Sequence, residues 1–201
     1  MANREPAPDE EALRAAFDAG RLQEVTATFL AGHAEEIQRF LASYLGNAEL
    51  AREVYCVFCE AFWKGLPSFE WRCSIRAWAY TLARHAAIRH GARQQNARRR
   101  ADRLAAIEPE PRAASGRTST APYLRTDVKS RMRALREQLS PDDQALIILR
   151  VDRGLAWREL CAVLSEGGQV NAQQEARLRK RFQLLKAKLR NLAIQQGLLE
   201  R

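Results

Sequence analysis

Two clusters of basic side chains give this chain its clearest chemistry. One spans residues 84–103 and holds seven arginines against a single acid, Asp102. The other spans residues 175–190 and holds seven lysines or arginines against Glu175 alone. Guanidinium and ammonium groups bind phosphate, and arginine also reads base edges. Together with a net charge of +9, the clusters predict two contacts with one extended polyanion.

The second cluster lies on a helix predicted over residues 171–192. Its apolar residues recur at steps of four, three, four and three, which lays one stripe against a core: Leu178, Phe182, Leu185, Leu189 and Leu192. A helix, a turn at Gly154 and a second helix precede it over residues 139–164, which is typical of a helix-turn-helix that enters the major groove. The predicted DNA contacts on its polar faces are Arg177, Arg179, Lys180, Arg181 and Lys186. We expect Arg177, Lys180 and Arg181 at base edges and Lys186 at phosphates.

The pair Cys56-x-x-Cys59 has the spacing of a metal or thiol-redox site. A four-ligand zinc site needs two more ligands, and the chain has no second Cys-x-x-Cys or His pair. A thioredoxin-like motif needs a βαβ setting, of which the sequence gives no sign. The spacing therefore favours small packed cysteines, and we expect no metal and no cofactor.

The elements that must position these residues are helices. Ala, Leu, Arg, Glu and Gln are abundant and β-branched residues are scarce, which predicts an all-α fold. The predicted helices span residues 9–18, 22–45, 48–64, 75–105, 127–138, 141–152, 156–165 and 172–196. Residues 108–122 hold three prolines and no large apolar side chain, which is typical of a flexible linker. We therefore predict four parts: an acidic segment (1–20), a helical domain (21–106), a linker (107–126) and a helix-turn-helix domain (127–201).

The N-terminus has no apolar signal core, and no apolar run is long enough to span a bilayer. We therefore expect a cytoplasmic protein, with its four cysteines reduced. The acidic start of the chain also suggests autoinhibition, in which it masks a basic face.

Residues 57–84 resemble the second conserved region of bacterial sigma factors of the extracytoplasmic-function group. The matching positions are Ser74, Arg76, Trp78, Tyr80, Leu82, Ala83 and Arg84. Residues 139–190 resemble the fourth conserved region of the same group. The resemblance implies a non-enzymatic protein that binds core RNA polymerase and places its two domains on the −10 and −35 promoter elements. An anti-sigma factor is a further candidate partner.

By this resemblance, the predicted −10 contacts are Trp71, Arg72, Arg84, His85 and Arg89. Trp78 is expected to be core, because it shares a helix face with Ile75 and Leu82. The five basic residues of the last helix are assigned to the −35 element. The predicted polymerase contacts lie on residues 48–64: Arg52, Tyr55, Cys56, Cys59 and Trp63. The opposite face is expected to be core and holds Leu50, Val54, Val57, Phe58 and Ala61. Whether the polymerase face meets a partner or lies under the N-terminal helices stays open.

The chain departs from the family's pattern where an acidic Asp-x-x-Gln-Glu signature would fall on Arg52, Tyr55 and Cys56. This favours, as an alternative, a sigma-like DNA-binding regulator that forms no productive holoenzyme. A thiol or zinc enzyme built on the two cysteines and a nonspecific nucleic-acid-binding protein are further alternatives. The sequence names neither the promoter, nor the target genes, nor the activating signal.

Overall fold

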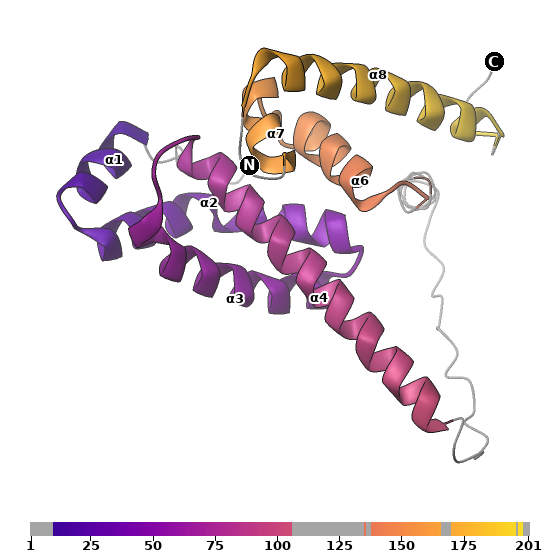
Figure 1. The fold of residues 1–201 in the computed structure, drawn as a ribbon, viewed down its shortest axis with the longest axis horizontal. Coiled ribbons are helices and arrows are strands. Elements are labelled where there is room, and N and C mark those ends of the chain that lie inside the picture. Colours follow the sequence, from indigo (N-terminus) through magenta and orange to yellow (C-terminus); the bar gives the residue numbers. More distant parts are fainter. Residues whose placement is uncertain (1–9, 106–134, 136–137, 166–169, 196, 199–201) are drawn as a thin grey trace, which may run out of the picture.

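The computed structural model describes residues 10–105, 135, 138–165, 170–195 and 197–198, with the backbone alone over 94–105. Within these residues every regular element is helical, which confirms the predicted all-α class (Figure 1). The first group comprises α1 (Glu10–Asp18), α2 (Leu22–Leu45), α3 (Ala48–Gly65), the 3-10 turn η1 (Leu66–Ser68) and α4 (Ile75–Ala105). The second comprises α6 (Pro141–Ile147), the π-helical segment η2 (Ile148–Asp152), α7 (Trp157–Leu164) and α8 (Ala172–Gln195). The predicted linker 107–126 lies outside the described residues, as does all but Leu135 and Gln138 of the predicted helix 127–138.

The helix boundaries follow from local capping. Gly46 has a φ of 67°, a left-handed conformation that ends α2, and the side chain of Asn47 then accepts hydrogen bonds from Glu49 N and Leu50 N. Ser74 Oγ accepts from Ala77 N at 3.1 Å and caps α4. Ser140 Oγ accepts from Asp143 N at 3.2 Å and caps α6. These polar residues fix where each helix starts.

In the first group, α2, α3 and the first half of α4 bury an aromatic core. The Phe29 and Phe62 rings stack with their centroids 4.7 Å apart. The Tyr80 ring of α4 meets Phe40 of α2 edge-on at 5.2 Å. Val54 and Phe58 of α3 are fully buried, as predicted. Val57, also predicted to be core, is 39% exposed. That prediction is wrong because Val57 lines a groove between α3 and α4 whose other wall includes Arg89 and His90.

In the second group, α8 lies across α6 and α7 (Figure 1). Leu178, Phe182 and Leu185 are buried, which confirms the predicted apolar stripe, whereas Leu189 is half-buried. The turn before α7 is made by Gly154, whose φ is 68°. The predicted helix 141–152 changes from α to π geometry at Ile148.

The two groups pack against each other through α4 and α7 (Figure 1). Their buried side chains form one continuous hydrophobic cluster, which runs from Leu13 of α1 to Leu185 of α8. Helix α4 extends beyond this contact, past the end of α3 (Figure 1). The side chains of Arg98, Arg99, Arg100 and Arg103 lie outside the described residues.

Candidate nucleic-acid interface

The loop between η1 and α4 is held by its aromatic residues. Phe69 is buried and stacks on Trp78 with the ring centroids 4.7 Å apart. Trp71 lies 5.0 Å from Phe69 and is half-buried. A Cβ added at Gly65 would lie 3.1 Å from the Trp78 ring, so glycine here leaves room for that ring at the end of α3. Sequence reasoning placed Trp78 in the core, and its packing against Phe62 and Phe69 agrees.

A pocket of about 500 Å³ lies beside this loop. Phe69 and Trp78 supply aromatic walls, and Ala162 and Ser165 close it from the α7 side. Three predicted −10 residues line it: Arg72, Arg84 and His85. Its volume and aromatic walls suit one planar group such as a nucleobase, and its charged lining residues are Arg72, Arg84 and Glu70.

The other two predicted −10 residues are not brought to this pocket. Trp71 packs toward α1, where Phe17 meets its ring edge-on at 5.7 Å. Arg89 is exposed and lines the separate groove between α3 and α4. The structure therefore brings Arg72, Arg84 and His85 to one pocket and places Trp71 and Arg89 elsewhere.

The pocket cations differ in their surroundings. Arg72 is exposed and pairs with Glu70 at 2.5 Å. Arg84 has only 12% of its side chain exposed and is bound to Asp142 of α6. Burial and the neighbouring charges of Arg84 and Arg89 lower the pKa of His85. The lowered pKa favours the neutral form of His85, which can both donate and accept a hydrogen bond.

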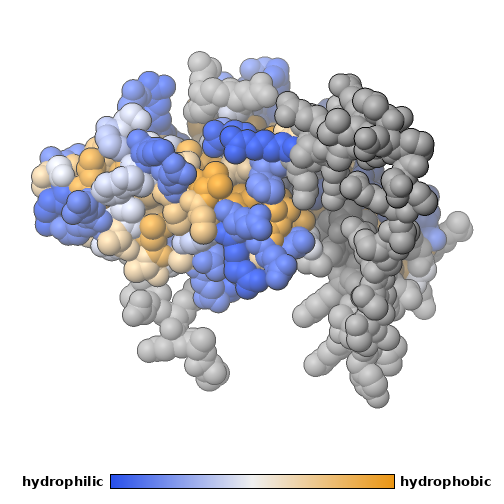
Figure 2. Space-filling view, turned by 90° about the horizontal axis from the view of Figure 1, so that it is seen from below, coloured by the Kyte–Doolittle hydropathy of each residue, from blue (hydrophilic) through white to orange (hydrophobic). Residues whose placement is uncertain are grey.

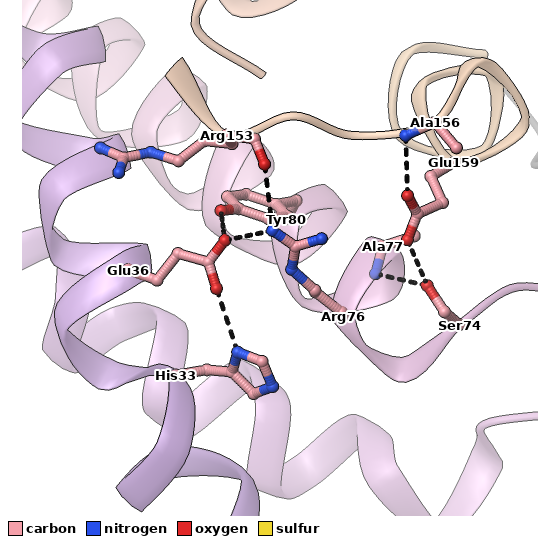
Figure 3. A network of polar contacts seen from close by, with 9 residues as sticks. All are labelled: His33, Glu36, Ser74, Arg76, Ala77, Tyr80, Arg153, Ala156 and Glu159. Atoms are coloured by element: carbon pink, nitrogen blue, oxygen red, sulfur yellow. Dashed lines mark hydrogen bonds and ion pairs between the residues drawn. The ribbon is translucent and has the colours of Figure 1, made fainter. Parts of the chain in front are cut away.

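Within the described residues, polar contacts tie α4 and its capping residue Ser74 to the second group, and those of Ser74 and Arg76 are drawn in Figure 3. Ser74 Oγ donates to Glu159 Oε1 at 3.1 Å, while Glu159 Oε2 accepts from Ala156 N at 2.9 Å. Arg76 donates to the carbonyl oxygen of Arg153 at 3.2 Å (Figure 3). A further contact is the Arg84–Asp142 pair.

Arg76 is itself held by a buried network that reaches α2 (Figure 3). Glu36 accepts hydrogen bonds from Arg76, from Tyr80 Oη at 2.7 Å and from His33 Nδ1 at 3.1 Å. Burial by itself raises the pKa of Glu36, but these hydrogen bonds and the charge of Arg76 lower it well below its usual range. Glu36 is therefore ionised and locks the start of α4 onto α2.

All five predicted −35 residues on α8 are exposed. Arg179 pairs with Glu175 and lies over the Trp157 ring. Arg181 Nε donates to Asp143 at 2.7 Å, and Lys186 lies over Phe182. Within the part of the chain that the structure describes, Arg177 and Lys180 form no ion pair.

The predicted polymerase face of α3 is largely uncovered. Arg52, Cys56 and Trp63 are exposed, and Tyr55 and Cys59 are half-buried. Trp63 has 45% of its surface exposed, which is more than the half-buried Tyr55 of the same helix. Figure 2, which views the molecule from below relative to Figure 1, shows apolar surface among hydrophilic side chains. The N-terminal helices therefore leave most of this face open to a partner.

The cysteines lie in surroundings that suit packing. Burial raises the pKa of Cys59, Cys73 and Cys161, so these groups stay as thiols at neutral pH. Among the described residues, no three His, Cys, Asp or Glu side chains come close enough to hold a metal ion. The Cys59 thiol lies beside the Tyr55 hydroxyl, four residues earlier on α3.

Sequence reasoning missed the acidic residues at this interface. Asp142 and Asp143 follow Ser140-Pro141 and have the pattern of an ordinary helix start. Their partners, Arg84 and Arg181, come from other helices, 58 and 38 residues away in the chain. Glu159 likewise has the position of a capping residue. The one available signal was two acids on a half-exposed helix start within a strongly basic chain.

Part of the chain matches a known family. Residues 29–97, from within α2 to within α4, match the family Sigma-70 region 2. The matched segment is therefore similar to region 2 of sigma factors, which are non-enzymatic transcription initiation factors. No curated protein matches the chain. No helix among the described residues is long and apolar enough to cross a membrane.

Proposed function

We propose that the chain is a sigma factor, similar to the extracytoplasmic-function group, that directs core RNA polymerase to a promoter. The observation that carries this proposal is the pocket beside the 69–73 loop. All but two of its lining residues fall within the segment that matches Sigma-70 region 2. A base that leaves the helical stack needs an aromatic or apolar pocket with a few polar groups around it.

In this proposal the first basic surface engages the −10 element. Phe69 and Trp78, which stack on each other, form the aromatic wall beside an unstacked base, and Arg72, Arg84 and His85 contact its edge or the adjoining phosphates. Arg89, one turn farther along α4, follows the strand. Trp71 takes a supporting role, because its ring packs against Phe17 of α1.

The second basic surface, on α8, engages the −35 element. Arg177 and Lys180 are exposed near the start of the helix, the end that reads base edges in a helix-turn-helix. Arg181 reaches DNA only after it leaves Asp143. Lys186 lies farther along the helix and suits a phosphate.

The packing of the two helix groups against each other limits how one molecule can reach both the −10 and the −35 promoter elements. By their names the elements lie about 25 base pairs apart, or roughly 85 Å at 3.4 Å per step. Arg84 and Arg181 instead pair with consecutive residues, Asp142 and Asp143. The proposal therefore requires α6–α8 to leave α4 before both surfaces engage one promoter.

The test is reconstitution with core RNA polymerase from the source organism, followed by run-off transcription from a genomic fragment library. Discrete transcripts that vanish with Arg72→Ala, and with Arg177→Ala, are the expected result. The control is Arg21→Ala, an exposed arginine at the start of α2 whose partner is Glu24. Transcripts that survive both substitutions would contradict the proposal.

A second candidate function is a sigma-like DNA-binding regulator that forms no productive holoenzyme. The observation that favours it is the α3 face, where Arg52 and Cys56 are exposed at the two acidic positions of the family's Asp-x-x-Gln-Glu signature. Pull-down of core polymerase separates the two. Stable capture supports the sigma factor, and specific promoter binding without capture supports the regulator.

A further inference from the structure

Helix α1 lies outside the matched residues 29–97 but contacts the loop at the proposed −10 site. Leu13 and Ala16 are buried and fix α1 to the first group of helices. Gly20, with a φ of 74°, then turns the chain back into α2. The side chains at positions 10, 14 and 17, spaced by four and three, project from one face of α1.

Trp71 has the most constrained position in that loop. Its φ is 54°, the one positive φ of a non-glycine residue within the described part of the chain. A bulky side chain rarely adopts this conformation, and it persists only where the surroundings enforce it. The indole Nε1–H is also buried without a hydrogen-bond partner among the described residues. Both features disfavour this conformation, so other contacts must hold Trp71 in place.

The contacts that hold it come largely from α1. Phe17 meets the Trp71 ring edge-on, with centroids 5.7 Å apart and planes at 84°, and it also meets Phe69 edge-on at 6.5 Å. The guanidinium carbon of Arg14 lies 5.5 Å from the centroid of the Trp71 ring. Glu10 Oε1 accepts a hydrogen bond from Ile75 N at 3.1 Å, where the loop enters α4. Three residues of α1 thus hold the middle and the end of the loop.

We propose that α1 is a positioning element for the loop between η1 and α4, at the proposed −10 site, with Phe17 and Arg14 as its positioning residues. They hold Trp71 inward as an anchor, which turns its exposed neighbour Arg72 to the pocket. Without them Trp71 relaxes to a negative φ, and Phe69 and Arg72 lose their placement. The effect on DNA rests on the proposed function, whereas the effect on the loop does not.

The loop is tested first, without DNA. Trypsin cleaves after Arg72, and cleavage requires the loop to leave its packed conformation. In the full-length protein we expect Phe17→Ala to speed cleavage after Arg72 by about tenfold. Phe17→Tyr, which keeps the ring edge, restores the slow rate. The matched control, Asp18→Asn, changes an exposed residue of α1 and leaves the rate unchanged.

DNA binding is tested next, with fluorescent pools of random-sequence single-stranded and duplex oligonucleotides. We expect Phe17→Ala to weaken single-strand binding and to spare duplex binding through α8. If Phe17→Ala fails to fold, Arg14→Gln replaces it, because this change leaves the buried residues of α1 intact. We expect Arg14→Gln also to speed cleavage after Arg72 and to weaken single-strand binding.

Each outcome decides between the two proposals. Faster cleavage after Arg72 with weaker single-strand binding, both rescued by Phe17→Tyr, supports the positioning role. An unchanged rate, or equal acceleration at all cleavage sites, overturns it. If Phe17→Ala frees the loop but the wild-type protein binds no single-stranded DNA, either alone or with core polymerase, the positioning of the loop stands and the proposed function fails.

Discussion

Arg84 of α4 donates to Asp142 at the start of α6, across 58 residues of sequence. The arginine side chain is 12% exposed and lines the pocket beside the loop, whereas the aspartate side chain is 48% exposed. The next residue, Asp143, accepts from Arg181 of α8. One acidic helix start therefore supplies counter-ions to a predicted −10 arginine and to a predicted −35 arginine.

Asp142 occupies a place that a DNA phosphate takes in the proposed complex. We expect Asp142→Asn to tighten DNA binding by roughly three- to tenfold, because Arg84 no longer has to exchange a carboxylate for a phosphate. Fluorescence anisotropy with a duplex and a single-stranded oligonucleotide measures the change. The matched control is Asp18→Asn, which changes the net charge equally at an exposed site on α1. Equal tightening in both variants would mean that only net charge matters.

Arg177 and Lys186 are expected to act differently on α8. Arg177 is exposed and unpaired among the described residues, near the start of the helix, so Arg177→Ala should cost about 1–3 kcal/mol at one base position and relax sequence preference there. Lys186→Gln should weaken all sequences alike and reduce the salt slope of log K by about one. Binding of a promoter and its single-base variants at several salt concentrations separates the two. A uniform loss from Arg177→Ala would contradict base reading.

The sequence predicted the helices well because their signals are local. The helices predicted to start at residues 48, 75 and 141 do start there, capped by Asn47, Ser74 and Ser140. The apolar stripe from Leu178 to Leu185 is buried. The site was predicted in part. Arg72, Arg84 and His85 do meet at one pocket, because the loop and α4 are adjacent in the chain.

The orientation of Trp71 could not be predicted from sequence. It depends on Phe17, a residue 54 positions earlier, and on a backbone angle that tryptophan rarely adopts. The ion pairs that Asp142 and Asp143 form with arginines of other helices could not be predicted for a similar reason. Their local role as helix-start residues is satisfied whether or not an arginine from another helix lies nearby.

Trp63 is the residue of the α3 face best suited to a protein partner, since exposed aromatic side chains often dominate interface energy. We expect Trp63→Ala to weaken core polymerase binding by about 2 kcal/mol, roughly 30-fold in Kd, with little change in Tm. Biolayer interferometry with immobilised core polymerase measures it. Val151→Ala is the control, because Val151 is 61% exposed on η2, away from α3. Equal affinity for wild type and Trp63→Ala would move the polymerase contact off this face.

Glu36 makes the contact between α2 and α4 sensitive to acid. Its pKa in the folded protein lies below the ordinary value of 4.5, so its ionised form stabilises the fold above that pH. As pH falls below about 4.5, the unfolded chain takes up the proton first and this stabilisation is progressively lost.

We expect Glu36→Gln to lower the free energy of unfolding by about 2 kcal/mol at pH 7, through weaker bonds from Arg76 and Tyr80. The difference from wild type should narrow toward pH 3 in urea denaturation. Glu35→Gln, at an exposed neighbour, should show no such trend. A Glu36→Gln deficit that stays constant between pH 7 and pH 3 would show that the loss comes from packing and not from the charge of Glu36.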